Sequence, residues 1–244
     1  MKLIAIPYAA GTAYAFQPVF KNLRPFVQAE AFEYPGHGRK IFLPLLESVP
    51  EIAQAILAEM FPIYEPYCLL GYSMGGHVLC ELYRLLIEKR YPLPTHVFLC
   101  AIDVPKQEPE EATDTSDQVL QKELMELGGT ASEILENQEF MEMLLPIYRA
   151  DIVAERNYVL PYDQIFRCEG TVIVGEAELN EENHFSEWQR YFAKPVRFRK
   201  VKGGHFFIQE EPGILAKILL DTIARLQNEA FQIKNQGGNH FNED

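Results

Sequence analysis

The segment GYSMGG at residues 71–76 holds a serine, Ser73, between glycines at the spacing that a catalytic nucleophile requires. It directly follows the apolar run at residues 67–70 and directly precedes a stretch with apolar residues three and four positions apart. These flanks predict a strand, a sharp turn and a helix. The turn crowds the backbone, so glycine is needed two positions either side of the nucleophile. We therefore expect Ser73 to attack an acyl group, and the amide of Met74 to donate to the developing oxyanion.

A serine hydroxyl is a weak nucleophile, so a histidine has to accept its proton and an acid has to hold that histidine in the right tautomer. For a nucleophile on such a turn, the order along the chain is serine, acid, histidine. His205 fits this order, because it lies in GGHFF at residues 203–207, after the last expected strand. The other histidines are interpreted as structural or poorly placed for this role: His37, His77, His96, His184 and His240.

The acid is expected where a strand ends. An expected strand at residues 171–175 runs into GEAEL, so Glu176 and Glu178 emerge at its carboxyl end. Glu178 is the preferred candidate, although a glutamate has one methylene more than an aspartate and its backbone must lie slightly farther from the imidazole. Asp103, at the end of the preceding expected strand, and Glu176 remain alternatives.

The loop YAAGT at residues 8–12 follows the first expected strand and consists largely of small residues. Small side chains let a backbone amide approach a substrate carbonyl, so we expect the amide of Ala9 to be the second oxyanion donor. A tight turn into an expected helix at residues 13–23 would explain the same small residues.

Short apolar runs alternate along the chain with longer segments of helical period. The expected strands lie at residues 3–7, 29–34, 67–71, 96–102, 171–175 and 196–201, and amphipathic helices are expected at 51–61 and 74–88. This alternation predicts an α/β fold with a mostly parallel central sheet and helices on both faces. The 244 residues are expected to form a single domain, with a frayed tail at residues 228–244.

The interval at approximately residues 105–165 contains no expected strand, but it has apolar residues at helical spacing, among them Met143 and Leu144. Between residues 107 and 142, eleven acids stand against one lysine, so this stretch carries −10 of the net charge of −13. Such an insertion in an α/β sheet is typical of a helical lid over a site, and Met143 and Leu144 would then contact the substrate. A solvated pair of acidic surface helices is the alternative.

The balance of 22 basic against 35 acidic residues argues against nonspecific binding to nucleic acid. The four cysteines lie far apart in apolar contexts and lack the spacing of metal or redox motifs, so we expect them to be buried in a reducing compartment. The serine, histidine and acid need neither a metal nor an organic cofactor. No apolar run is long enough for a membrane helix. Pro7 breaks the apolar amino terminus, which favours a buried strand over a signal peptide. We expect a cytoplasmic protein that does not bind membranes.

Across nearly its whole length the sequence resembles the type II (external, editing) thioesterases of nonribosomal peptide and polyketide synthesis, which are α/β-hydrolases. Besides GYSMGG, the segments that carry the resemblance are IPYAAGTAYAF at 6–16, EYPGHGRK at 33–40, LPIYRADIVAERNY at 145–158, VIVGEAE at 172–178 and GGHFFI at 203–208. The resemblance implies that the protein removes acyl or aminoacyl groups from the phosphopantetheine arm of a carrier protein, and so clears stalled synthases.

Three positions depart from the family pattern. YAAG stands where the family has HAGG, His37 stands where members usually carry arginine, and Glu178 replaces the usual aspartate. Two other functions are therefore kept open. A carboxylesterase or lipase would use the same triad, and a catalytically weak protein that docks onto a synthase would retain only the fold.

Carrier proteins are typically acidic where the pantetheine arm emerges, so basic residues outside the acidic interval are candidate docking groups. These residues are Arg39, Lys40, Lys194, Arg197, Arg199, Lys200 and Lys202. For those from residue 194 onward, the alternative is an edge strand that is charged to prevent aggregation.

Overall fold

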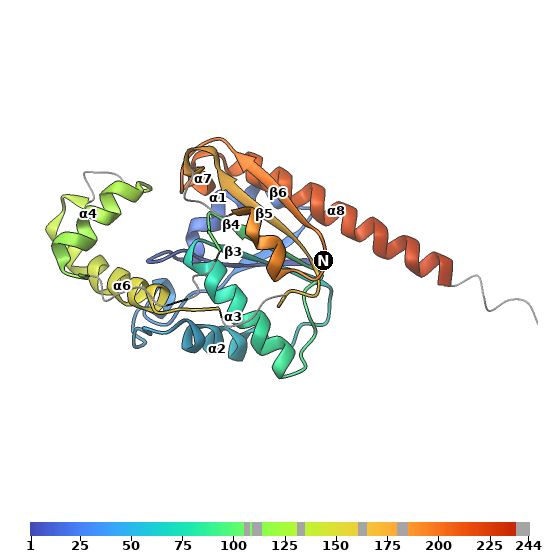
Figure 1. Ribbon diagram of the computed structural model, residues 1–244, viewed down its shortest axis with the longest axis horizontal. Coiled ribbons are helices and arrows are strands. Elements are labelled where there is room, and N and C mark those ends of the chain that lie inside the picture. The colour runs from blue at the N-terminus through green and yellow to red at the C-terminus, as the bar shows by residue number, and fades with distance from the viewer. Residues whose placement is uncertain (105–107, 109–113, 131–134, 161–164, 180–184, 238–244) are drawn as a thin grey trace, which may run out of the picture.

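The computed structural model describes residues 1–104, 108, 114–130, 135–160, 165–179 and 185–237. At its centre lies a six-stranded sheet in the order β2-β1-β3-β4-β5-β6, and all neighbouring strands run parallel (Figure 1). The strands are β1 (Lys2–Ile6), β2 (Gln28–Ala31), β3 (Tyr67–Tyr72), β4 (His96–Cys100), β5 (Glu169–Gly175) and β6 (Val196–Val201). The direction of strand addition reverses between β1 and β3, and α/β sheets bind ligands at the carboxyl ends of the strands at such a point.

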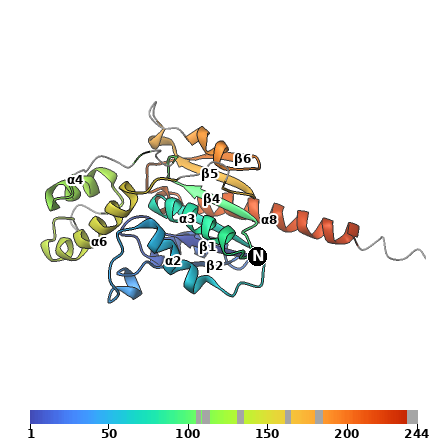
Figure 2. The ribbon, with the colours of Figure 1, turned by 60° about the horizontal axis from the view of Figure 1, so that its bottom comes forward.

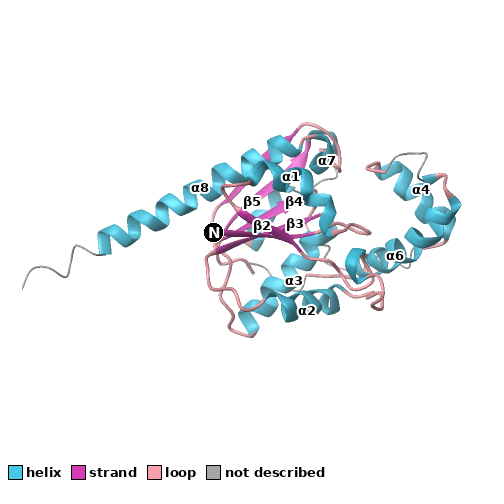
Figure 3. Ribbon diagram, turned by 180° about the vertical axis from the view of Figure 1, so that it is seen from behind, coloured by secondary structure: helices cyan, strands magenta, loops and turns pink. Residues whose placement is uncertain are grey.

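Both faces of the sheet are buried, which explains why β3 and β4 are continuous apolar runs. On one face, side chains such as Leu69 and Val97 pack against α2 (Val49–Met60) and α3 (Met74–Glu88). On the other face, Leu70 and Phe98 belong to a core with α1 (Gln17–Leu23) and α8 (Pro212–Gly237). Figure 3 shows these two helix layers on opposite sides of the strands. The fold is the expected α/β architecture.

Two helices between β4 and β5 stand off one end of the sheet, α4 (Asp117–Leu127) and α6 (Gln138–Arg156), and we call them the lid helices (Figures 1 and 2). They share a separate apolar cluster that includes Leu120, Leu124, Leu145 and Tyr148. Ala9 and Ala10, in the loop after β1, pack against this cluster. The lid helices therefore contact the sheet domain at a loop that the sequence singles out for chemistry.

Element boundaries agree with the sequence where the pattern is clean and differ where a turn intervenes. Strand β6 and helix α3 coincide with the predicted ranges. Strand β4 ends two residues before the predicted residue 102, because Ala101 has a φ of 50° and turns the chain. Helix α8 continues through residues 228–237, where the sequence predicts a frayed tail, and an Arg225–Glu229 ion pair joins its successive turns.

The remaining elements are short: η1 (Ala13–Phe16), η2 (Gly38–Lys40), η3 (Glu176–Glu178), η4 (Phe185–Tyr191) and α7 (Phe207–Glu210). All four cysteines are buried and unpaired with one another, as their apolar sequence contexts predict. Among the described helices, none combines the length and the apolar character that a membrane span requires.

Candidate active site

Ser73 lies on the turn between β3 and α3, where its backbone adopts φ 52° and ψ −127°. This conformation is uncommon for a residue with a side chain, and surrounding structure has to hold it. A Cβ on Gly71 would collide with the backbone of Gly75, and a Cβ on Gly75 would collide with the carbonyl oxygens of Ile6 and Pro7. The glycines that the motif requires are thus explained by close backbone approach, as the sequence predicts.

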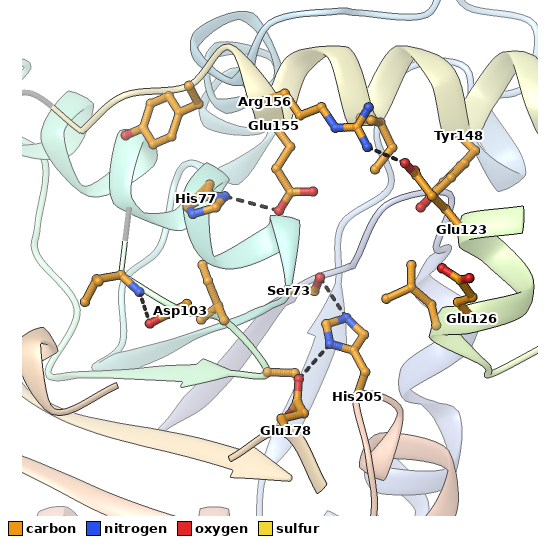
Figure 4. Close-up of a pocket in the computed structure, with 16 residues that line it drawn as sticks. Ser73, His77, Asp103, Glu123, Glu126, Tyr148, Glu155, Arg156, Glu178 and His205 are labelled. Carbon is orange, nitrogen blue, oxygen red and sulfur yellow. Dashed lines mark hydrogen bonds and ion pairs between the residues drawn. The ribbon is translucent and has the colours of Figure 1, made fainter. Parts of the chain in front are cut away.

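Ser73, His205 and Glu178 form a continuous chain of hydrogen bonds (Figure 4). The Ser73 Oγ lies 3.0 Å from the Nε2 of His205, and the His205 Nδ1 lies 2.8 Å from the Oε1 of Glu178. The side chains of His205 and Glu178 are 21% and 16% exposed, so the chain is shielded but remains open to a ligand. The structure brings together the serine, histidine and acid that the sequence singles out.

Backbone contacts between two loops set the distance from Glu178 to His205. The Ala177 amide donates to the Gly203 carbonyl at 3.0 Å. The other carboxylate oxygen of Glu178 accepts from the amide of Gly175 at 2.9 Å. Because a 3-10 turn carries Glu178 and bends it back onto its own strand, the longer side chain reaches the imidazole without lengthening the hydrogen bond.

The hydroxyl of Tyr72 fixes the loop that carries His205. It donates to the His205 carbonyl at 2.6 Å and accepts from the Ile208 amide at 3.2 Å. Burial raises the pKa of Tyr72, so the phenol stays protonated and keeps both bonds. The residue next to the candidate nucleophile thereby also holds the histidine, a role that the sequence analysis missed.

The two alternative acids lie elsewhere. The Oδ1 of Asp103 accepts from the amide of Val104 at 2.8 Å, and neither its carboxylate nor that of Glu176 is bonded to His205. Glu176 is exposed. Of the three carboxylates weighed from the sequence, Glu178 is the one that contacts the imidazole.

Two backbone amides near Ser73 have no hydrogen-bond partner within the described part of the chain, those of Ala9 and Met74. Their neighbours in the loop after β1 are engaged, because the Gly11 amide donates to the Tyr8 carbonyl and the Ala10 amide donates to Asp151. Ala9 follows β1 and Met74 follows β3, and these strands are adjacent in the sheet. Both amides therefore lie unbonded at the switch point, where α/β sheets bind ligands.

A cavity of about 600 Å³ lies beside Ser73, between the sheet and the lid helices. Its apolar walls include Ile102, Leu127 and Ile152. Besides Glu178, its acidic and basic groups are Asp103, Glu123, Glu126, Glu155 and Arg156, and Figure 4 shows them around the serine and histidine. Arg156 pairs with Glu123 at 2.6 Å. The described lining thus carries more carboxylates than cations.

The expected substrate contacts of Met143 and Leu144 are wrong. Neither residue lines the cavity, and Met143 is 67% exposed. The face of α6 that reaches the cavity instead carries Tyr148, Ile152 and Glu155, at helical spacing. Helical periodicity gave the spacing of the apolar face but not the direction in which that face points.

The remaining described histidines have distinct surroundings. His96 is buried against Thr171 at 2.9 Å, and burial lowers its pKa to about 4, in agreement with a structural role. His77 lines the cavity, and its Nδ1 lies 3.3 Å from Glu155. His37 is buried and its Nε2 lies 2.9 Å from Asp151. His184 and His240 lie outside the described residues. Nothing in the local sequence signals the His37–Asp151 contact, which joins two segments that the sequence analysis used only for the family resemblance.

Metal-ligating side chains do not cluster in groups of three or more anywhere in the described part of the chain. Ser73, His205 and Glu178 supply a hydroxyl, an imidazole and a carboxylate in one hydrogen-bonded chain. These are the groups that acyl transfer to serine requires.

Comparison with known proteins points in the same direction. A family model of the thioesterase domain matches residues 1–224. Thioesterase PikA5 of Streptomyces venezuelae is 26% identical over 86% of this chain and 76% of its own length. The gramicidin S biosynthesis protein GrsT of Aneurinibacillus migulanus is 28% identical over 86% of this chain and 84% of its own length.

Solved structures agree. The RedJ thioesterase from the prodiginine pathway of Streptomyces coelicolor superposes with a TM-score of 0.79 at 26% identity, covering 90% of this chain and 89% of that one. The type II thioesterase BorB from the borrelidin biosynthetic cluster gives 0.78 at 26% identity, covering 90% and 91%. The α/β-hydrolase fold and the resemblance to type II thioesterases are thereby confirmed. The chain belongs to the thioesterase family, and it is a thioester hydrolase.

Proposed function

We propose that this thioesterase hydrolyses acyl or aminoacyl thioesters held on the phosphopantetheine arm of carrier proteins, and so clears stalled or wrongly primed synthases. The observation that carries the proposal is the hydrogen-bond chain from Glu178 through His205 to Ser73, at the edge of a cavity of about 600 Å³. The relatives support the substrate class, because GrsT and BorB are described as proteins of gramicidin S and borrelidin biosynthesis.

In the first half of the reaction, His205 takes the proton of the Ser73 hydroxyl as Oγ attacks the thioester carbonyl. Glu178 accepts from the Nδ1 of His205, which keeps Nε2 free to act as a base and stabilises the imidazolium that forms. Collapse of the tetrahedral intermediate breaks the carbon–sulfur bond. The leaving pantetheine thiolate takes the proton back from His205, and an acyl-serine remains.

The amides of Met74 and Ala9 are assigned to the developing oxyanion. Neither has a partner within the described chain, and both follow adjacent strands at the switch point. Met74 is the first residue of α3, so the helix dipole adds to the field at that position. In the second half, His205 activates a water that attacks the acyl-serine, and the acid product leaves with Ser73 restored.

We propose carrier proteins as partners and assign no cofactor, since the steps above need only groups of this chain. Of the candidate docking groups, Arg39 pairs with Glu33 and Lys40 pairs with Glu59. Lys200 and Lys202 are exposed on and next to β6, which is an edge strand. Four buried cysteines that form no disulfide support a reducing compartment such as the cytoplasm.

The test compares three substrates on the purified protein: an acyl-carrier protein thioester, the matching acyl-cysteamine thioester and the matching p-nitrophenyl ester. We expect the highest kcat/KM on the carrier-bound thioester. A preference for the oxygen ester would favour a carboxylesterase. Labelling by a fluorophosphonate probe, lost in Ser73→Ala, checks that the serine is activated. No labelling together with no turnover would favour a protein that only docks.

A further inference from the structure

A buried carboxylate on lid helix α6 contacts the loop that carries the proposed oxyanion donor. Asp151 has 0% exposure, and its Oδ2 accepts from the amide of Ala10 at 2.7 Å. The same oxygen lies 2.9 Å from the Nε2 of His37, in the loop after β2. Three segments that are distant in sequence thus meet at one oxygen atom.

The hydrogen bonds of His37 fix where its protons lie. Its Nδ1 is 3.0 Å from the carbonyl oxygen of Pro35, which can only accept, so Nδ1 carries a hydrogen. An ionised Asp151 can also only accept, so Nε2 carries a hydrogen as well. The pair is therefore an imidazolium facing a carboxylate, or its neutral form with the shared proton on Asp151. In both forms the pair holds one proton more than a neutral His37 and an ionised Asp151 would hold together.

The loop at residues 8–11 contains a residue in an unfavourable backbone conformation, and bonds to distant segments help to hold it. Ala10 adopts a φ of 56°, which is unfavourable for a residue with a Cβ. The Gly11 amide closes the turn onto Tyr8, and the Tyr34 hydroxyl donates to the Pro7 carbonyl at 2.5 Å. The bond from the Ala10 amide to Asp151 fixes the peptide between Ala9 and Ala10, which is joined through the Ala9 Cα to the peptide that carries the Ala9 N–H.

Both described hydrogen bonds of the Asp151 carboxylate converge on one oxygen. Oδ2 lies within hydrogen-bond distance of the Ala10 amide and of His37 Nε2, whereas Oδ1 is buried and has no partner among the described residues. The contacts of the carboxylate thus concentrate on the oxygen that faces the loop.

We infer that Asp151 is a positioning residue for thioester hydrolysis: with protonated His37 as its partner, it holds residues 8–11 so that the Ala9 amide is presented to the oxyanion. The inference rests on the proposed function. It also couples the lid to the reaction, because Asp151 lies on α6 beside the cavity residues, three positions after Tyr148 and four before Glu155. A substrate that displaces α6 would displace the loop at residues 8–11 with it; we call this segment the oxyanion loop.

The first experiment compares Asp151→Ala, which removes the acceptor, with Asp151→Asn, which can retain an oxygen for the Ala10 amide. Asp117→Asn is the control, because Asp117 forms an exposed ion pair with Arg149 between the two lid helices and lies outside the cavity. We expect Asp151→Ala to lower kcat on a small acyl-cysteamine thioester between about tenfold and a hundredfold while KM changes less than about twofold, because oxyanion donors act in the transition state. Asp151→Asn should recover at least half of this loss on a logarithmic scale, and Asp117→Asn should match the wild type.

Melting temperature and the rate of fluorophosphonate labelling are measured on the same samples. Labelling does not depend on the thioester substrate, so it separates this inference from the proposed function. A wild-type protein that labels at Ser73 but leaves carrier thioesters intact would refute the function and leave the labelling comparison to decide the inference. A folded Asp151→Ala that labels at the wild-type rate, or that changes only KM, would overturn it. If Asp151→Ala does not fold, unchanged labelling in Asp151→Asn would overturn it equally.

The second experiment is a pH profile of labelling and turnover between pH 6 and 9 for the wild type and His37→Gln. Burial by itself would lower the pKa of His37, but its hydrogen bond to Asp151 and the charges of Asp151 and Glu33 outweigh this, so the pKa is raised. Glu155 on α6 and the neutral phenol of Tyr34 are the other titratable groups that face the pair. Glu155 adds negative charge, which also favours the proton.

Because the pKa is raised, the His37–Asp151 interaction is complete below the ordinary histidine pKa of about 6.5 and is lost as pH rises through the folded-state pKa. Deprotonation leaves His37 one hydrogen for two acceptors, so one bond must break. We expect wild-type activity to fall on the alkaline side, and His37→Gln to start lower and lack that step. The same alkaline profile in both proteins would overturn the part assigned to His37.

Discussion

The serine turn and the oxyanion loop lie side by side in the sheet but are held in different ways. Ser73 is held mainly by the elements that flank it, because β3 ends and α3 begins within one residue of it, and its amide also donates to the Cys100 carbonyl at the end of β4 at 2.8 Å. The loop at residues 8–11 is held by Asp151, which lies 141 residues farther along the chain from Ala10. A short motif in the sequence therefore signals the nucleophile, whereas the proposed oxyanion site depends on how the lid helices pack.

The largest effect should come from the serine itself. Ser73→Ala removes the nucleophile and should lower turnover by about 10⁴-fold or more while the fold stays intact, since loss of one triad member costs several powers of ten in rate. The measurement is kcat on an acyl-cysteamine thioester, with circular dichroism and thermal melting as the control. Substantial residual hydrolysis by the purified variant would remove Ser73 from the mechanism.

The acid comes next. Glu178→Gln should lower kcat by about 10²- to 10⁴-fold, because the amide no longer fixes the His205 tautomer or stabilises the imidazolium. Asp103→Asn is the matched control, as Asp103 lines the same cavity but is not bonded to His205, and it should stay within about threefold of the wild type. The reverse ranking would transfer the role to Asp103.

Gly75 lies where the serine turn meets the start of the loop, so it tests how rigidly the two regions are joined. Gly75→Ala would place a Cβ against the carbonyl oxygens of Ile6 and Pro7, and overpacking of this kind should lower the free energy of unfolding by about 3 kcal/mol. Chemical denaturation measures it. Gly213→Ala is the control, because nothing lies within 4 Å of the added carbon there. Equal stability of both variants would mean that the turn yields easily.

A substitution of Tyr72 tests how strongly the loop at residues 203–207, which carries His205, depends on its bonds to the strand that precedes Ser73. Tyr72→Phe removes the bonds to the His205 carbonyl and the Ile208 amide, and we expect kcat to fall about tenfold with little change in KM. Tyr83→Phe removes another buried hydroxyl, which bonds to the Arg167 amide away from the site, and should lower only the melting temperature. An unchanged kcat in Tyr72→Phe would show that the other contacts of this loop, such as the bond from the Ala177 amide to the Gly203 carbonyl, are enough to place His205.

The smallest expected effect is on KM for the carrier protein, from two exposed lysines on and next to β6. The double change Lys200→Glu and Lys202→Glu should raise KM for an acyl-carrier protein about threefold to tenfold and weaken its salt dependence, because like charges slow the encounter. It should leave kcat/KM for acyl-cysteamine unchanged. The double change Lys21→Glu and Lys217→Glu, at exposed positions of α1 and α8, matches the change in net charge. Parallel losses on both substrates would mean that the lysines serve the fold or the active site and not docking.

The comparison also explains what could be predicted from the sequence. Ser73 and His205 follow from short motifs, and the strands follow from apolar runs, because each depends on neighbours in the chain. The end of one expected strand favoured Glu178 as the acid, but the sequence left Asp103 and Glu176 open as alternatives. The Asp151–His37 contact had no such signal: its partners are 114 residues apart, and the carboxylate is recognised only once α6 is seen to pack on the loop.

The lid shows a second reason for failure. Met143 and Tyr148 belong to the same amphipathic helix, and the pattern alone cannot tell which part of its apolar face reaches a cavity and which part faces solvent. That choice is made by the angle at which α6 crosses the sheet domain, and tertiary packing sets this angle. The acidic residues of the interval posed the same problem, since Glu123 and Glu126 line the cavity although their charge suggests an outer surface.

Because all four thiols are buried, their rate of alkylation reports how often the fold opens locally. Cys68, Cys80, Cys100 and Cys168 all lie in or beside the sheet, while the lid helices carry none. Burial raises the pKa of each thiol, to about 11 for Cys168, so a thiol reagent in neutral solution meets little thiolate. Cys68, Cys80 and Cys100 are 0% exposed and Cys168 is 7% exposed. Alkylation of the first three therefore requires the packing around the sheet to open, and its rate measures that opening separately from any motion of the lid helices.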